Sequence, residues 1–197
     1  MNTMRTAPWM RCVILLAAGC FSASSMAQSL EFNLSDKSVE LGFRAPTPWG
    51  LSGRSQFDGS MLFRDNDPED YTMAGLGVEV MGDAGLASPG VQFGVNLKGY
   101  YANLSDNDVG AIALGGLVRV APAQMPRLYG QVGLRFAPNI VTFNDGEKMR
   151  FADLRIGYEI LPEAEVYLGY RSAEVELETG VEETIDESVF VGLRILF

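Results

Sequence analysis

The sequence of 197 residues contains no histidine, and its two cysteines, Cys12 and Cys20, both lie near the N-terminus. The absence of histidine excludes serine–histidine and cysteine–histidine catalysis and removes the commonest general base and metal ligand. Basic residues are also few, 15 against 25 acidic ones, so the formal net charge is −10. An acidic chain without a basic patch does not suit a nucleic-acid surface. We therefore expect no nucleic-acid partner, no cofactor, no metal site and no catalytic residue.

The first residues of the chain are typical of an export signal. Arg5 and Arg11 form a basic start, residues 12–21 form a short apolar run, and small residues then precede a cleavage site. The sequence predicts cleavage between Ala27 and Gln28. Residues before this point are therefore set aside from the reasoning about the fold.

The predicted division of the chain is a signal peptide, 1–27, followed by a barrel domain, 28–197. Two alternatives to cleavage remain open, namely an uncleaved membrane helix and a lipoprotein signal that ends at Cys20. The apolar run is short compared with the roughly 20 residues of a membrane-spanning helix. Because both cysteines lie in the signal, the exported chain has no thiol and no disulfide.

The rest of the chain is a series of segments in which apolar and polar residues alternate, separated by turn residues. No apolar run after the signal approaches the roughly 18 residues of a membrane helix. The alternation covers eight long segments, residues 51–64, 72–80, 91–98, 112–120, 127–136, 153–160, 165–171 and 189–197. A shorter hairpin at 30–34 and 39–43 precedes them.

This pattern predicts an all-β protein, an antiparallel up-and-down transmembrane β-barrel. We count ten strands, eight long ones plus the short N-terminal hairpin, because an even number places both ends on one side. An eight-strand barrel, with the hairpin as a separate segment, is the alternative. One segment departs from the pattern, because after Arg171 the apolar residues shift phase to Ala173, Val175 and Leu177. A β-bulge near Ser172, or a strand that runs past the membrane, would explain the shift.

The connections between the segments indicate that the apolar face points to lipid. Compact, mostly proline-containing turns alternate with acidic loops such as 65–70 and 174–187, which is the asymmetry of outer-membrane barrels. The last segment has an apolar residue at every second position up to the terminal phenylalanine, as in the C-terminal assembly signal of such proteins. These residues are Val189, Val191, Leu193, Ile195 and Phe197.

Charged residues on the opposite face would then point into the lumen. A barrel of eight to ten strands is nearly filled by its own side chains, and buried charges must pair. We therefore predict a salt-bridged plug. A narrow polar path that prefers anions is the alternative, because arginines outnumber acids in the set. The predicted lumen charges are Arg54, Asp58, Glu79, Lys98, Arg119, Arg135, Asp153, Arg155, Glu159, Arg171 and Arg194.

Five short stretches of this sequence resemble the YfaZ family of predicted outer-membrane proteins. They are residues 32–43, 97–102, 113–116, 166–171 and 191–197, which span most of the exported chain. Each stretch is short and rich in glycine. The resemblance implies a location in the outer membrane and a barrel architecture. It implies no reaction and no catalytic residue.

The predicted function is that of a small outer-membrane barrel of a Gram-negative bacterium, with a structural or interaction role and a mostly occluded lumen. The alternatives are a narrow anion-preferring channel, a soluble lipocalin-like periplasmic carrier, and a histidine-independent lipid-modifying enzyme. The expected partners are outer-membrane lipid and lipopolysaccharide, together with the barrel-assembly machinery during biogenesis. The expected oligomeric state is a monomer.

Overall fold

The structure, a computed structural model, describes residues 28–197 except 49–54, 66–69, 86–89, 105–106 and 178. The predicted signal peptide therefore lies outside the described residues, and so does Arg54. No helix in the described part of the chain is both long enough and apolar enough to span a bilayer.

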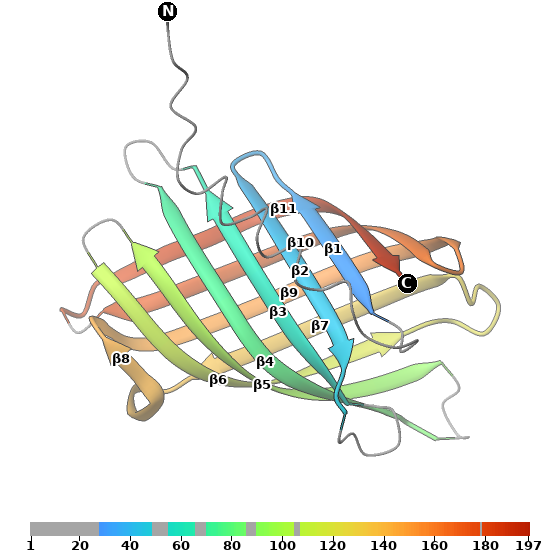
Figure 1. Ribbon diagram of the computed structural model, residues 1–197, viewed down its shortest axis with the longest axis horizontal. Helices are drawn as coiled ribbons and strands as arrows, with labels where there is room; N and C mark the ends of the chain where they lie inside the picture. Colours follow the sequence, from blue (N-terminus) through green and yellow to red (C-terminus); the bar gives the residue numbers. More distant parts are fainter. Residues whose placement is uncertain (1–27, 49–54, 66–69, 86–89, 105–106, 178) are drawn as a thin grey trace, which may run out of the picture.

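The described chain is almost entirely β-structure (Figure 1). The elements are β1 (Ser29–Leu34), β2 (Ser38–Pro46), β3 (Ser55–Arg64), β4 (Tyr71–Asp83), β5 (Val91–Leu104), β6 (Asn107–Val120), β7 (Leu128–Ala137), the 3₁₀ turn η1 (Asn139–Val141), β8 (Thr142–Asn144), β9 (Gly146–Leu161), β10 (Ala164–Leu177) and β11 (Glu182–Leu196).

Ten of these strands form a closed antiparallel barrel. Neighbours in the chain pair with one another, β7 pairs with β9, and β1 pairs with β11 to complete the wall. The prediction of a ten-stranded barrel is confirmed, and the eight-strand alternative is wrong because the short hairpin β1–β2 is part of the wall.

The additional strand β8 arises from an interruption of the wall. Pro138 follows β7 and has no N–H group to donate, and the chain then makes the turn η1 before it returns to β6. The return pairs residues 142–144 with residues 109–111 of β6. Asn144, with a φ of 63°, then turns the chain into β9.

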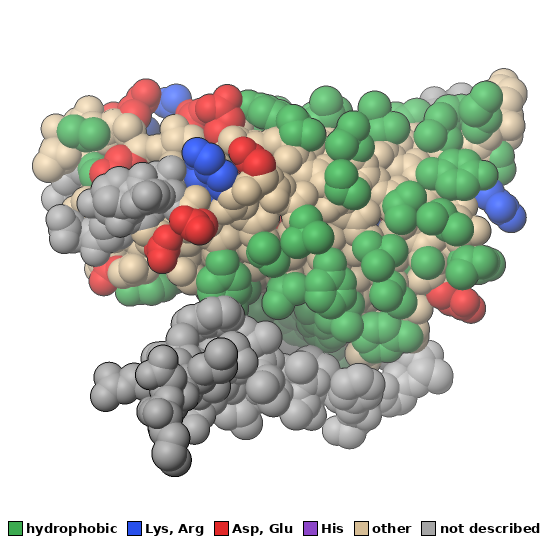
Figure 2. Space-filling model, turned by 90° about the horizontal axis from the view of Figure 1, so that it is seen from above, with side chains coloured by type: hydrophobic (Ala, Val, Ile, Leu, Met, Phe, Trp, Pro, Cys, Tyr) green, Lys and Arg blue, Asp and Glu red, His purple; other side chains and the backbone are tan. Residues whose placement is uncertain are grey.

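The apolar side chains of the wall point outward along most of its length. Leu76 is 71% exposed and Leu134 is 61% exposed, whereas Arg135, which follows Leu134, points inward and pairs with Asp153. Figure 2 shows hydrophobic side chains spread over the wall, with charged side chains gathered near its ends. We call these outward-pointing apolar side chains the apolar belt. Such a surface is suited to contact with the acyl chains of a membrane. It contradicts the lipocalin-like alternative, in which the apolar face would fill the interior.

We call the end of the barrel that carries the acidic loops the loop end, and the opposite end the turn end. At the loop end the polar side chains face outward and the apolar side chains face inward. The alternation of β10 continues without a break, so that Arg171, Ala173 and Val175 all point inward and Glu174 is half-exposed outside. The apolar residues change phase because the wall here extends past the membrane, with water outside and an apolar interior. A bulge near Ser172 is therefore not the cause of the phase shift.

The irregularity lies in β11 instead. Ala173 pairs with Asp186 and Glu174 pairs with Thr184, so Ile185 is the extra residue of a bulge. Both Ile185 and Asp186 are buried.

The wall is also unequal in height. The hairpin β1–β2 ends early at the loop end, where the last pair of β1 is Leu34 with Val191, whereas β11 continues on to Glu182 (Figure 1). No strand of the described chain pairs with this side of β11 above Val191. The side chain of Arg64 bridges the gap, because its Nη1 donates to the carbonyl of Ile185 at 3.1 Å.

Candidate functional site

The lumen contains two layers, and the layer at the loop end is apolar. Its side chains come from β3 to β6, β7 and β9 to β11. All of them are buried, and the rings of Tyr100 and Phe151 stack with centroids 4.2 Å apart. We call this layer the hydrophobic plug: Leu62, Met73, Tyr100, Ala102, Leu104, Val109, Ala111, Ala113, Ala137, Met149, Phe151, Ala173, Val175, Leu177 and Ile185.

The second set of inward side chains is charged. Most of it lies nearer the turn end, whereas Arg64 and Asp186 lie level with the plug at the loop end. Seven carboxylates and eight cations point inward here, and their side chains are mostly buried. We call this layer the charged belt: Glu31, Glu40, Arg44, Asp58, Arg64, Glu79, Lys98, Arg119, Arg135, Asp153, Arg155, Glu165, Arg171, Asp186 and Arg194.

Glu31 on β1 contacts more arginines than any other carboxylate for which the described residues show ion pairs. Its Oε1 accepts a hydrogen bond from Nε of Arg194 at 2.8 Å and lies 2.7 Å from Nη1 of Arg44. Its Oε2 accepts from Nη1 of Arg155 at 3.0 Å. The three arginines lie on β11, β2 and β9. One carboxylate therefore connects both sides of the closing seam to β9, two strands beyond β11.

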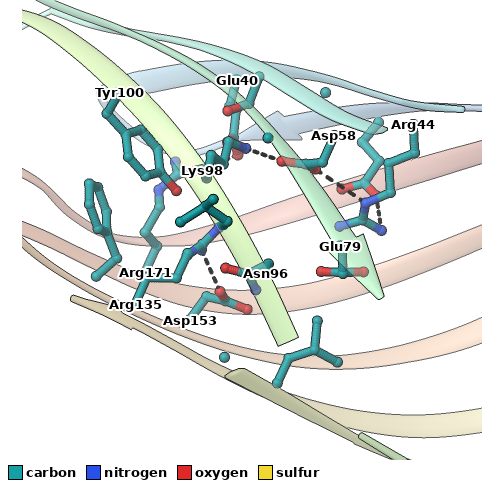
Figure 3. Close-up of a pocket in the computed structure, with 18 of the residues that line it drawn as sticks. Glu40, Arg44, Asp58, Glu79, Asn96, Lys98, Tyr100, Arg135, Asp153 and Arg171 are labelled. Atoms are coloured by element: carbon teal, nitrogen blue, oxygen red, sulfur yellow. Dashed lines mark hydrogen bonds and ion pairs between the residues drawn. The ribbon is translucent and has the colours of Figure 1, made fainter. Parts of the chain in front are cut away.

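Each of these three arginines also has a second carboxylate. Asp58 lies 3.3 Å from Nε of Arg44 and also accepts from Lys98 (Figure 3). Glu165 accepts from Nη1 of Arg194 at 2.9 Å. The charges therefore form a continuous network across the lumen rather than isolated pairs.

Arg155 joins a fourth carboxylate, Asp153, to this network. Its Nε lies 3.7 Å from Oδ2 of Asp153, and Oδ1 of Asp153 accepts from Nη2 of Arg135 at 2.8 Å (Figure 3). The guanidinium of Arg119 stacks over the ring of Tyr129, with 3.7 Å between its Cζ and the ring centroid. Arginine is suited to such sites because it can stack and hydrogen-bond together.

Asp186 links the loop-end part of β11 to neighbouring strands of the barrel. It is fully buried, and Arg171 donates to it from the neighbouring strand at 2.7 Å. Arg64 of β3 and the hydroxyl of Ser38 of β2 both approach it at 3.3 Å. Arg171 also pairs with Glu40 of β2. These contacts span the region where β1 is absent.

A cavity of about 50 Å³ lies in the charged belt and extends to the underside of the plug. Its wall includes Asp58, Arg135 and Asp153 from the belt, and Asn96 beside them (Figure 3). Phe151 of the plug also lines it. No group of three or more potential metal ligands occurs within the part of the chain that the structure describes.

The structure brings nine of the eleven predicted lumen charges together in the charged belt. Glu79 is one of them and accepts from Gln56 at 2.7 Å. Arg54 lies outside the described residues. Glu159 is half-buried at the turn end of β9, away from the belt. The five residues predicted as the assembly signal, Val189, Val191, Leu193, Ile195 and Phe197, all point outward and are exposed.

Sequence reasoning missed six members of the belt: Glu31, Glu40, Arg44, Arg64, Glu165 and Asp186. Three of them lie on the short hairpin, whose place in the wall was uncertain from its length. The alternation of Glu31 with Leu30 and Phe32 was a usable signal. Asp186 was hidden within an acidic segment that we expected to be a surface loop.

Outside the plug, the exterior of β9 and β10 is polar and extends beyond the apolar belt. Lys148 donates to both carboxylate oxygens of Glu176, at 3.1 and 3.2 Å. This hydrogen bond raises the pKa of the Lys148 ammonium above its ordinary value. Opposite charges side by side on neighbouring strands are typical of a wall that faces water.

No curated protein matches the sequence. Among solved structures, the KdgM porin in complex with disordered oligogalacturonate is similar with 6% identity and a TM-score of 0.45, over 87% of this chain and 99% of that chain. The outer membrane channel DcaP of Acinetobacter baumannii is similar with 11% identity and a TM-score of 0.40, over 90% of this chain and 60% of that one.

OmpT of Vibrio cholerae is similar with 14% identity and a TM-score of 0.40, over 81% of this chain and 56% of that one. This chain therefore covers less than two thirds of the length of either DcaP or OmpT.

The sequence pattern described as the YfaZ precursor matches residues 4–197, almost the whole chain. This match confirms the resemblance seen in the short glycine-rich stretches. The closed barrel and its apolar exterior are those of an exported outer-membrane protein. The chain belongs to the YfaZ precursor family.

Proposed function

We propose that this protein is a structural or interaction component of the outer membrane whose lumen is closed to solutes. The observation that carries the proposal is the hydrophobic plug, which fills the lumen at the loop end beside Arg64 and Asp186 and lies above most of the charged belt. An ion that entered from the loop end would lose its hydration shell among side chains that are almost fully buried.

The charged belt supports the same proposal. Each of its eight cations lies within ion-pair distance of a carboxylate. A charge held this way is neutralised locally and is not free to attract a permeating ion. The belt therefore serves to fill a narrow barrel with paired groups, which is the role that buried charges most readily have.

A narrow anion-preferring channel is the second candidate. The one observation that favours it is the excess of cations over carboxylates in the belt. An enzymatic role has less support, because the sequence has no histidine and the two-carboxylate mechanisms need a substrate cleft. The cavity in the belt, at about 50 Å³, is too small for a lipid or sugar substrate.

Single-channel recording in planar bilayers tests the proposal. We expect no stepwise current from protein whose folded state is verified by its gel mobility before and after boiling. Stepwise anion-selective current would instead support the channel. In that case Lys98→Gln in the belt should reduce the anion preference. The matched exterior variant, Lys148→Gln, should leave it unchanged.

The partners that we propose follow from the exterior. The apolar belt contacts acyl chains, and the polar wall of β9 and β10 faces the headgroups of lipopolysaccharide. The C-terminal strand β11, which closes the barrel against β1, is the segment that we propose the barrel-assembly machinery engages. Light scattering of the purified protein in detergent tests the proposed monomeric state.

A further inference from the structure

Four polar atoms around the cavity beneath the plug have no hydrogen-bond partner among the residues that the structure describes. They are Oδ1 of Asn96, Nε of Arg135, Oδ2 of Asp153 and Nε of Arg155. All four side chains line the same cavity. Asn96, Asp153 and Arg155 are each more than nine-tenths buried. Figure 3 shows Asn96 beside Asp153 and Arg135.

The chemistry of these four atoms indicates what occupies the cavity. Two of them are acceptors and two are donors. Nε of Arg155 and Oδ2 of Asp153 face each other at 3.7 Å, which is too far for a hydrogen bond, and a buried polar atom without a hydrogen bond is costly. A small anion would meet the Asp153 carboxylate and the Asn96 carbonyl oxygen. A metal cation would meet two guanidinium groups, which carry positive charge and have no lone pair to offer. Of these three occupants, water is the one that both donates and accepts, so it satisfies the whole set.

The size of the cavity agrees with this chemistry. A buried water needs about 10–15 Å³ of such volume, so about 50 Å³ admits roughly three to five molecules. Two glycines of the wall leave room for the side chains involved. A β-carbon at Gly133 would lie 2.6 Å from Oδ1 of Asp153, and one at Gly115 would lie 2.9 Å from Oδ1 of Asn96.

We propose that this cavity is a built hydration site, in which a cluster of ordered water molecules bridges Asn96, Arg135, Asp153 and Arg155. The plug separates these waters from the loop end of the barrel, so this inference builds on the closure proposed above. The charged belt is then held together by water as well as by direct ion pairs. The lumen beneath the plug then contains water but gives solutes no path across the membrane.

Strand β6 offers matched positions for a test on the unmodified protein. Ala111, Ala113 and Gly115 all point inward on this strand, the two alanines into the plug and the glycine against Arg135 and Asn96, which line the cavity. The measurement is water-to-protein magnetisation transfer in solid-state NMR of the barrel in lipid. We expect the initial transfer rate at the α-protons of Gly115 to be at least threefold that at the two alanines.

The possible outcomes separate this inference from the proposed function. Slow transfer at Gly115 and at both alanines would show a dry cavity and overturn the hydration site, while the closed lumen would stand. Fast transfer at all three would show that water crosses the plug, which would overturn both. A saturable shift of the Nε signals of Arg135 and Arg155 on addition of chloride would show that an anion occupies the cavity. That result would overturn the hydration site.

A variant gives a second readout. Asn96→Leu keeps the size of the side chain and removes the acceptor, and we expect water transfer at Gly115 to fall at least twofold. The control Glu176→Gln, on the outer wall, should leave the rate unchanged. A rate at Gly115 that Asn96→Leu does not alter would overturn the role of Asn96 in holding the water cluster.

Discussion

Replacing Glu31 by glutamine removes one negative charge from the centre of the charged belt while preserving the shape of the side chain. Three arginines then lose a carboxylate that lies 2.7 to 3.0 Å away. Each arginine keeps one other carboxylate, but those carboxylates already serve a further cation. Asp58, for example, is shared with Lys98, and Glu165 is shared with Arg119.

The expected loss of stability is therefore that of a buried, broken ion pair. Such changes remove about 3–5 kcal/mol, because the remaining charges stay buried without full compensation. Glu31 is almost fully buried, so solvent screens little of the effect. The exposed control, Glu187→Gln, should remove less than about 1 kcal/mol, because the hydrogen bond that Glu187 accepts from the Tyr170 hydroxyl is exposed to water.

Equilibrium unfolding in lipid vesicles, followed by the fraction of the protein that runs as folded barrel on a gel, measures both variants. A loss below about 1 kcal/mol for Glu31→Gln would refute the reasoning, because it would mean that the belt needs no carboxylate at this position. An equal effect of the two variants would do the same, since it would show that burial does not matter.

Three further predictions concern the wall. Gly169 lies under the ring of Phe190, where a β-carbon would come within 2.7 Å of Cε2, so Gly169→Val should destabilise the barrel by about 1–3 kcal/mol in the same unfolding assay. Leu114→Arg, on the exposed apolar face, should destabilise the barrel in lipid by up to about 2–4 kcal/mol, and no loss there would contradict the membrane orientation. Lys148 should titrate by NMR above its ordinary pKa, with the stabilisation present at neutral pH and lost only as alkaline pH passes the raised value, and Glu176→Gln should lower that pKa.

The strands could be predicted from the sequence because each side chain of the wall faces either the lipid or the lumen. In β6, for instance, Ile112 and Leu114 face outward and Ala113 faces inward, and the alternation was legible without any structure. The acidic loops and compact turns then set the direction of the wall. This reasoning needs only the two-residue period of a strand, which is why it succeeded over most of the chain.

The pairing of the charges could not be predicted in the same way. Glu31 and Arg155 are 124 positions apart in sequence, and their contact depends on the stagger with which the whole barrel closes. The exchange of faces in β10 was one of two explanations that the sequence left open, beside a bulge near Ser172. The sequence shows Ala173 and Val175 out of phase, but only the structure shows that the surroundings changed there and the strand did not.

The unequal height of the wall has a consequence for behaviour in a crowded membrane. The upper part of β11 carries backbone donors and acceptors that an approaching chain could use to extend the sheet. The extra residue Ile185 kinks this stretch, Asp186 turns a charge inward, and Glu182 and Glu187 repel a similar neighbour. Adjacent copies therefore meet no straight, uncharged strand edge onto which they could add.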